Sequence, residues 1–178
     1  MLKKSDGVFA SACRKVWRGH PGVNFGEMYV DSAAMNLIRD PESFDVIVTT
    51  NLFGDILSDE AAQLVGGLGL APSANLGDKF ALFEPVHGSA PDIANRGIAN
   101  PVAMLLSVSM MLDWFDESRR DHVCGRAATT LRTAVNAALE RGICTPDLGG
   151  KSKSTEVASF VARQIRNGRE KGQESGRG

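Results

Sequence analysis

The sequence predicts an α/β fold, because short apolar runs typical of strands alternate along the chain with the residue spacing typical of amphipathic helices. Strands are predicted over residues 25–30, 44–50 and 80–86. The run FDVIVTT at 44–50 is apolar and rich in β-branched residues, which is the composition of a strand buried on both faces. A glycine-rich loop at 66–69 and a turn at 72–78 are predicted before the third strand.

Apolar residues at helical spacing predict the remaining elements. Asp31 follows the first predicted strand and can cap the helix that comes next, and Asn100 before a proline is a typical helix start. The end of the chain has no apolar residue and alternates glycine with charges, so we predict one domain over 1–166 and a disordered tail over 167–178. The predicted helices cover residues 8–17, 32–39, 52–64, 101–115, 126–140 and 154–165.

Composition argues against several classes of protein. The 178 residues carry 20 basic and 21 acidic side chains, a net charge of −1, which gives no electrostatic reason to expect a nucleic-acid partner. No apolar run approaches the roughly 20 residues of a membrane span, so we expect no membrane association, and we expect no leader peptide. The three cysteines lack Cys-x-x-Cys spacing, so we expect reduced thiols in a cytoplasmic protein.

The strongest candidate for chemistry is the segment 51–60, which directly follows the second predicted strand. Asp55 and Asp59 are four residues apart, so on a helix both carboxylates project from the same face. Such a pair can bind a hard divalent cation such as Mg²⁺ or Mn²⁺, or it can belong to an ordinary solvated acidic face. The apolar neighbours Leu52 and Ile56 favour the cation, because they leave little polar surface for a solvated face.

A second candidate is the loop over 84–101, which leaves the third predicted strand and is rich in small residues and prolines. Small residues let a backbone approach a phosphate or an adenosine, and Asp92 can accept two hydrogen bonds from a ribose diol. The same pattern also fits a rigid surface loop, in which His87 is an ordinary loop histidine. Asp31 is a third candidate, and it can equally be a helix cap and nothing more.

The usual dinucleotide-binding signature is absent from the chain. The GLG sequence at 67–69 lacks the third glycine of G-x-G-x-x-G, and Pro72 follows closely, so it is not a Rossmann fingerprint. The chain also lacks a P-loop, a G-x-S-x-G nucleophile elbow and an H-E-x-x-H zinc motif. A standard Rossmann fold is therefore not expected.

Taken together, the candidate segments resemble the metal-dependent β-decarboxylating dehydrogenases, the family of the isocitrate and isopropylmalate dehydrogenases. The resemblance covers residues 2–165 in family order and implies that family's α/β fold, of which this chain matches only the C-terminal half. Details at 5–9, 77–79 and 105–111 look most like 3-isopropylmalate dehydrogenases. The motifs that carry the resemblance are YVDSAAM at 29–35, FDVIVT at 44–49, NLFGDILSD at 51–59, LAPSAN at 70–75, EPVHGSAPDIA at 84–94 and TPDLGG at 145–150.

The resemblance implies a role for each matching residue. Asp55 and Asp59 correspond to ligands of Mg²⁺ or Mn²⁺, and Asp31 corresponds to the aspartate that reaches the same metal from the other subunit of a homodimer. Asp31 and Asp55 are accordingly the expected catalytic residues. Glu84 lies where the family approaches the nicotinamide ring, and Asp92 stands where NAD-dependent members carry an acid. The other expected cofactor-binding residues are His87, Gly88, Ser89, Ala90, Pro91, Ala99 and Asn100.

The implied function is the NAD-dependent oxidative decarboxylation of a small 2-hydroxy-3-carboxy acid, most similar to that of 3-isopropylmalate in leucine biosynthesis, with homoisocitrate and isocitrate as alternatives. The family's catalytic lysine and tyrosine and its substrate-binding arginines belong to the N-terminal half, and the only tyrosine here, Tyr29, lies on another segment. We therefore expect the isolated chain to be an inactive fragment that works with a separate N-terminal half or within a longer chain. The alternative from another class is a non-catalytic nucleotide-binding, metal-binding or regulatory module.

Two predicted helices have more apolar surface than one buried face needs. The predicted helices over 52–64 and 101–115 carry apolar residues on more than one face, including Leu106 and Met110. A helix in a monomer usually confines such residues to one stripe, whereas a two-fold dimer can bury a second face. We therefore expect a homodimer with shared active sites.

Overall fold

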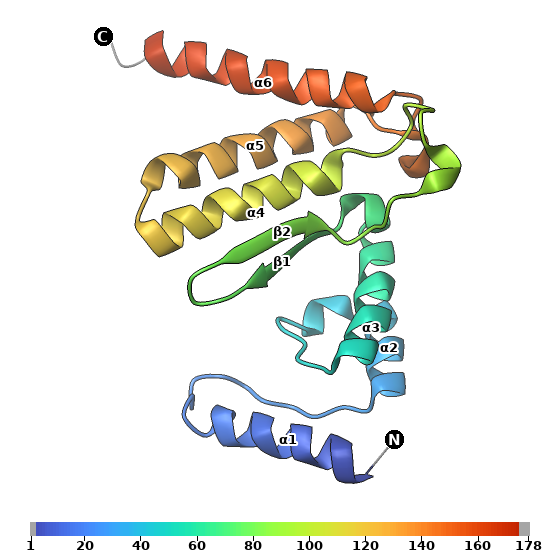
Figure 1. The fold of residues 1–178 in the computed structure, drawn as a ribbon, viewed down its shortest axis with the longest axis vertical. Helices are drawn as coiled ribbons and strands as arrows, with labels where there is room; N and C mark the ends of the chain where they lie inside the picture. The colour runs from blue at the N-terminus through green and yellow to red at the C-terminus, as the bar shows by residue number, and fades with distance from the viewer. Residues whose placement is uncertain (1–2, 175–178) are drawn as a thin grey trace. The chain divides into compact units, whose positions relative to one another are not determined.

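The computed structural model describes residues 3–174 and divides into two compact units, Met1–Leu57 and Ser58–Gly178, where the sequence predicts one domain over 1–166. The boundary falls inside helix α3 (Asn51–Leu64). Figure 1 labels the helices and strands in chain order. Among the described residues, no helix combines the length and the apolar character needed to cross a bilayer.

The first unit contains the first two predicted helices. Helix α1 (Lys3–Trp17) ends just before Gly19, as predicted, and α2 (Val30–Arg39) ends before the short turn η1 (Pro41–Ser43). Asp40 follows α2, and its backbone N–H donates to the carbonyl of Asn36 at 2.7 Å. Both helices therefore end where the sequence has a glycine or a proline to stop them.

The loop between α1 and α2 is tied back to α1 by an aromatic stack and an ion pair. Trp17 stacks on Phe25 with ring centroids 5.4 Å apart, and its indole N–H donates to the Val23 carbonyl at 2.8 Å. Arg14 Nη2 lies 2.6 Å from Glu27 Oε2. Hydrogen bonding to Arg14 lowers the pKa of the Glu27 carboxyl, and the Glu27 carboxylate raises the pKa of Arg14.

Two strands predicted in the first unit do not form, so those predictions are wrong. The described residues hold a single two-stranded sheet, and neither 25–29 nor 44–50 belongs to it. A strand forms only where a neighbouring strand takes up its backbone N–H and C=O groups, and these segments have no such neighbour in the described chain. The run at 44–50 is exposed rather than buried on both faces, since Val46 is 81% and Val48 is 68% exposed.

The second unit contains an antiparallel hairpin of β1 (Pro72–Leu76) and β2 (Ala81–Pro85). Strand β2 confirms the third predicted strand. Strand β1 replaces most of the turn predicted at 72–78, because β2 lies alongside and takes up its backbone hydrogen bonds. The actual turn is shorter and is closed by a hydrogen bond from the Gly77 N–H to the Phe80 carbonyl at 3.0 Å.

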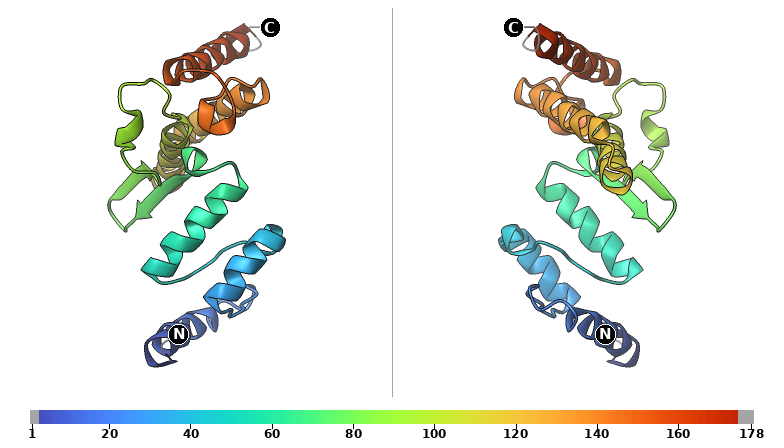
Figure 2. Two further views of the ribbon diagram at one scale, coloured as in Figure 1. Left: turned by 90° about the vertical axis from the view of Figure 1, so that its right-hand side faces the viewer. Right: turned by 90° about the vertical axis from the view of Figure 1, so that its left-hand side faces the viewer.

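Three long helices make up the rest of the second unit. They are α4 (Val102–Arg119), α5 (His122–Glu140) and α6 (Ser154–Glu174). Figures 1 and 2 show α4 between the hairpin and α5, and α5 between α4 and α6. The core lies where these helices meet, and its buried residues are Val102, Leu131, Ala134, Val135, Ala138, Val157, Phe160 and Val161.

Helix α4 has neighbours on two sides within the second unit. The helix packs against α5 on one side and against β1 and β2 on the other. Leu106 packs against the core, and Met110 is half-buried. The hairpin and α5 therefore cover part of the apolar surface of α4, Met104 stays 50% exposed, and a dimer contact through Leu106 and Met110 remains a prediction.

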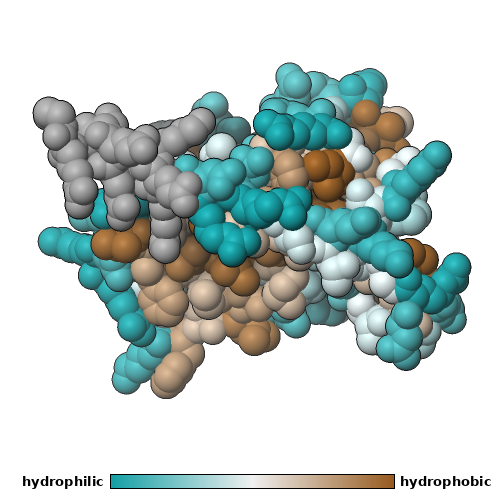
Figure 3. Space-filling model, turned by 90° about the horizontal axis from the view of Figure 1, so that it is seen from above, coloured by the Kyte–Doolittle hydropathy of each residue, from teal (hydrophilic) through white to brown (hydrophobic). Residues whose placement is uncertain are grey.

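Helix α6 extends beyond its predicted end. It continues to Glu174, so residues 167–174 of the expected disordered tail are helical, and residues 175–178 lie outside the described chain. The buried Val157 and Val161 anchor the first half of the helix in the core. Figure 3 views the molecule from above and shows hydrophilic side chains spread among apolar ones on that side.

Candidate active site

Asp55 and Asp59 both lie on α3, which confirms the predicted helix. One helical turn separates them, so their carboxylates project from the same side of the helix, and both side chains are exposed. Their apolar neighbours are exposed too, with Leu52 at 65% and Ile56 at 53%. Carboxylate oxygens are the donors that Mg²⁺ and Mn²⁺ prefer, so this pair fits a divalent cation.

Asp31 lies in the first turn of α2 rather than at its N-cap, which is Tyr29. Its Oδ1 accepts a hydrogen bond from the Ser32 backbone N–H at 2.8 Å. The capping role considered for Asp31 is therefore wrong, because the helix already begins at Val30. Among the side chains that the structure describes, residues 3–168, no three histidine, cysteine or carboxylate groups converge on a possible metal position.

Glu84 lies on β2, directly before the loop that carries the other expected cofactor-binding residues. The strand register places Glu84 opposite Ser73 of β1. The side-chain amide of Asn75 donates to Glu84 Oε1 over a long 3.5 Å contact. The Glu84 carboxylate remains exposed and available to a ligand.

The loop over residues 86–101 joins β2 to α4 and contains all of the other expected cofactor-binding residues. Its middle is the short turn η3 (Pro91–Ile93), which the chain enters through Ala90 in the left-handed region, with φ of 44°. The imidazole Nδ1 of His87 donates to the Gly88 carbonyl over 2.9 Å. These features give the start of the loop a defined, compact shape.

Small exposed residues leave the backbone open at the tip of this loop. Gly88, Ser89 and Ala90 are exposed, and no atom lies within 4 Å of the position that a Cβ on Gly88 would take. Asp92 is also exposed, on η3. An open backbone beside an exposed carboxylate fits the phosphate and ribose of an adenosine group.

Asn100 connects the end of the loop to two other parts of the second unit. Its Oδ1 accepts from the Val102 N–H at 3.0 Å, so it makes the predicted capping bond although α4 begins one residue later than expected. Its Nδ2 donates to Asp147 Oδ2 at 2.9 Å. Asp147 lies on the short turn η4 (Pro146–Leu148) in the TPDLGG motif.

Ser154, at the start of α6, also holds the loop. Its backbone N–H donates to the Gly97 carbonyl at 2.9 Å, and its hydroxyl donates to the Ala99 carbonyl. The loop accordingly runs beside the N-terminal end of α6 in Figures 1 and 2. Sequence reasoning missed the contacts of Asp147 and Ser154; the TPDLGG motif was the one available signal for Asp147, and Ser154 had none.

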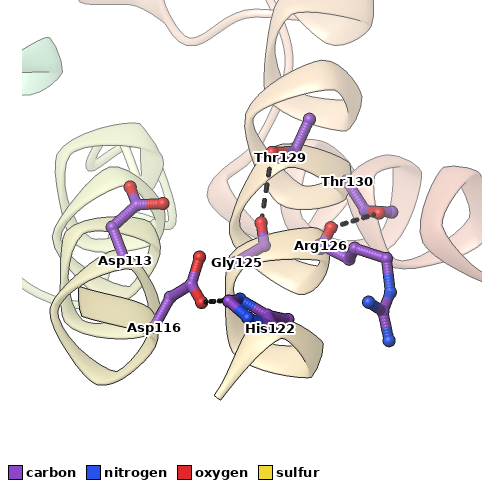
Figure 4. A pocket seen from close by; sticks show the side chains of 7 residues that line it. All are labelled: Asp113, Asp116, His122, Gly125, Arg126, Thr129 and Thr130. Atoms are coloured by element: carbon purple, nitrogen blue, oxygen red, sulfur yellow. Dashed lines mark hydrogen bonds and ion pairs between the residues drawn. The ribbon is translucent and has the colours of Figure 1, made fainter. Parts of the chain in front are cut away.

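A pocket of about 570 Å³ lies elsewhere in the second unit, between the C-terminal end of α4 and the first half of α5 (Figure 4). Asp116 points toward His122, with Oδ1 2.8 Å from the imidazole Nδ1. Two threonine hydroxyls in the pocket donate to the helix carbonyls of Gly125 and Arg126. The pocket contains none of the expected site residues.

Residues 1–163 match the family model described as isocitrate/isopropylmalate dehydrogenase. The chain belongs to this family of β-decarboxylating dehydrogenases, which confirms the resemblance found in its motifs.

Three relatives illustrate how much of the family's length is present. The 3-isopropylmalate dehydrogenase of Saccharolobus solfataricus is 54% identical over 166 residues, which cover 93% of this chain and 49% of the relative. The homoisocitrate dehydrogenase of Methanocaldococcus jannaschii is 51% identical, with 93% and 46% covered. The crystal structure of isocitrate dehydrogenase from Methylococcus capsulatus matches with a TM-score of 0.85 at 44% identity, covering 93% of this chain and 48% of that one. The chain thus spans about half the length of these relatives and matches the C-terminal portion of the family.

Proposed function

We propose that this chain supplies the metal-binding and adenosine-binding half of an NAD-dependent dehydrogenase that oxidatively decarboxylates a 2-hydroxy-3-carboxy acid. The family supports the class of reaction. The names of the relatives support 3-isopropylmalate as the substrate, with homoisocitrate and isocitrate as alternatives. The observation that carries the proposal is the loop over 86–101, whose small residues are exposed while its far end is held by Asn100 and Ser154.

The loop binds the adenosine part of NAD in this proposal. His87 to Asp92 surround the ribose and phosphates, and Ala99 and Asn100 lie at the adenine. The exposed Asp92 carboxylate accepts hydrogen bonds from the ribose hydroxyls and repels the 2′-phosphate of NADP. Glu84 lies at the nicotinamide end of the site. When bound, NAD takes up the hydride from the hydroxyl-bearing carbon of the substrate.

The aspartates of α3 hold the divalent cation, Mg²⁺ or Mn²⁺, in this proposal. Asp55 and Asp59 provide oxygen ligands from one subunit, and Asp31 comes from the second subunit of a homodimer with shared sites. When bound, the cation stabilises negative charge on the oxygens of the substrate. Asp31 and Asp55 are the proposed catalytic residues, because a carboxylate beside the substrate hydroxyl can accept its proton.

The substrate anchors and the remaining proton-transfer groups come from the half of the family fold that this chain does not match. The second candidate function is a non-catalytic module that binds nucleotide or metal. The two functions differ in whether the chain, once completed, turns over a substrate.

Complementation tests the proposal. The chain is produced together with the N-terminal half of the Saccharolobus solfataricus relative, and NADH formation is measured with Mg²⁺ and, separately, 3-isopropylmalate, homoisocitrate or isocitrate. We expect NADH from one of these acids and none after Asp55→Asn, with Asp78→Asn as an exposed control on the hairpin turn. A stable complex that binds NAD but oxidises none of the three acids would favour the non-catalytic module.

A further inference from the structure

We infer that Asp147 is a positioning residue for the cofactor loop: acting through Asn100, it holds the end of the loop in the conformation that receives adenosine. This inference rests on the proposed function, which places the adenosine part of the cofactor at residues 87–100. Neither the motifs nor the family match assigns a role to Asp147. Its contact with the loop joins residues that lie 47 positions apart in the sequence.

Asn100 is held at both ends of its side-chain amide. The Oδ1 accepts from the Val102 N–H at 3.0 Å, and the Nδ2 donates to Asp147 Oδ2 at 2.9 Å. A planar amide fixed by two bonds in opposite directions cannot flip, and one hydrogen on Nδ2 and one lone pair on Oδ1 remain for a ligand. The bond to Asp147 has a charged acceptor, which makes it the stronger of the two. Losing it would free the amide to rotate about its remaining contact.

Asp147 can act as an anchor because its own turn is firmly built. The Leu148 N–H donates to the Thr145 carbonyl at 3.0 Å, and the Gly150 N–H donates to the same carbonyl at 3.1 Å. Thr145 is fully buried, and Gly149 has the left-handed φ of 76° that glycine adopts without strain. The turn therefore presents the Asp147 carboxylate from a fixed position.

Gly69 completes the arrangement and offers an independent way to disturb it. A Cβ at this position would lie 2.6 Å from Asp147 Oδ2 and 3.0 Å from Asn100 Nδ2. Any larger residue would have to push the two partners apart. Gly69→Ala therefore breaks the Asn100–Asp147 bond while it leaves both of these side chains, and their charge, in the protein.

The experiment measures ligand binding to the purified chain by isothermal titration calorimetry, with NAD, AMP and nicotinamide mononucleotide as probes. We expect Asp147→Ala to lower the affinity for NAD and for AMP by about tenfold, because one charge-assisted hydrogen bond is lost. Nicotinamide mononucleotide should be unaffected, because it does not reach Asn100. Gly69→Ala should lower the affinity for NAD and AMP as much as Asp147→Ala does. Asp147→Asn keeps an acceptor oxygen, so its loss of affinity should be smaller.

Two matched controls accompany these variants. Asp78→Asn removes a charge from the exposed hairpin turn, and Gly22→Ala adds a Cβ where no atom lies within 4 Å. Both should bind NAD as the unaltered chain does. Unchanged AMP affinity in Asp147→Ala, or an equal loss for nicotinamide mononucleotide, would overturn the positioning role.

Failure of the proposed function would be seen separately. If the unaltered chain binds neither NAD nor AMP, the proposed cofactor site is wrong, and amide hydrogen exchange over residues 94–100 still decides the role of Asp147. Faster exchange there in Asp147→Ala and Gly69→Ala, but not in the two controls, shows that Asp147 holds the loop. Unchanged exchange in both variants overturns the inference.

Discussion

Asp55 and Asp59 lie one turn apart on α3 with both carboxylates exposed, so two like charges stand side by side on one helix face. In the absence of a cation, such a pair destabilises a helix by about 0.2–0.5 kcal/mol. A divalent cation between the carboxylates reverses the sign of this effect. If the pair binds a cation as proposed, the site can be detected from stability as well as from activity.

Substitution of Asp59 by asparagine should change the free energy of unfolding in opposite directions with and without metal. Without metal, Asp59→Asn should raise the free energy of unfolding by about 0.2–0.5 kcal/mol, because the repulsion is gone. With Mn²⁺ the unaltered chain should be the more stable, because only it gains the free energy of binding. Urea unfolding with and without Mn²⁺ measures both effects, and Asp45→Asn is the exposed control. Equal stabilisation of both chains by Mn²⁺ would disprove the site.

Asp92 should select NAD over NADP. In the proposed site the Asp92 carboxylate binds the ribose hydroxyls and repels a 2′-phosphate, so Asp92→Lys should reverse the preference by tenfold or more. Calorimetry with both cofactors measures the ratio of their affinities, and Asp78→Lys repeats the charge change on the distant hairpin turn. A ratio that stays the same in Asp92→Lys would place the ribose elsewhere.

The isolated chain should show no dehydrogenase activity. The family's lysine, tyrosine and substrate-binding arginines are not matched here, and loss of one proton-transfer group alone costs typically 10²–10⁴-fold in rate. NADH formation is measured with 3-isopropylmalate and Mg²⁺ at high protein concentration. Activity that disappears in Asp55→Asn would show that this chain needs no further residues for catalysis.

Self-association should depend on the first unit. Ile38 of α2 is 63% exposed, and Ile56 of α3 is exposed as well, so these helices present apolar surface that a second copy can bury. Sedimentation velocity should show a dimer that Ile38→Asp and Ile56→Asp convert to a monomer. Leu106→Asp should instead lower the melting temperature, because Leu106 packs against the core. A chain that is monomeric before any substitution would refute the proposed dimer.

The Arg14–Glu27 pair should make stability depend on acidity. The pKa of Glu27 is lowered by its hydrogen bond to Arg14, so the pair stabilises the folded chain above the ordinary glutamate pKa. This stabilisation is lost as the pH falls through the lowered pKa, because protonated Glu27 no longer pairs with the guanidinium. Thermal unfolding across this range should show a smaller pH dependence in Glu27→Gln. Identical pH profiles would mean that the pair contributes nothing in solution.

The helices could be predicted because their signals are local. Glycine after α1, proline after α2 and apolar residues at helical spacing through α4 to α6 all lie within the elements that they define. The strand predictions at 25–30 and 44–50 failed for the opposite reason. The apolar, β-branched composition of residues 44–50 is real, but a strand also needs a partner, and composition says nothing about whether the described chain provides one.

For the candidate site, too, the local features could be predicted from the sequence and the long-range contacts could not. The spacing of Asp55 and Asp59 and the small residues of the cofactor loop were visible in the sequence. The bond between Asn100 and Asp147 was not, because it joins residues 47 positions apart, and only the packing of α6 and η4 beside the loop brings them together. The need for glycine at position 69 likewise could not be predicted, because it depends on how close Asp147 and Asn100 lie in space.

NMR chemical-shift mapping can locate bound NAD on the chain and so tests the proposed cofactor loop directly. The backbone amides are assigned on isotopically labelled protein, and NAD is added in steps. If the loop is the cofactor site, saturable shifts appear at residues 87–92 and 99–100, with no change around His122 and Arg126 in the α4–α5 pocket. An unchanged spectrum, or shifts that centre on the α4–α5 pocket, would contradict the claim that this loop is a nicotinamide-cofactor site.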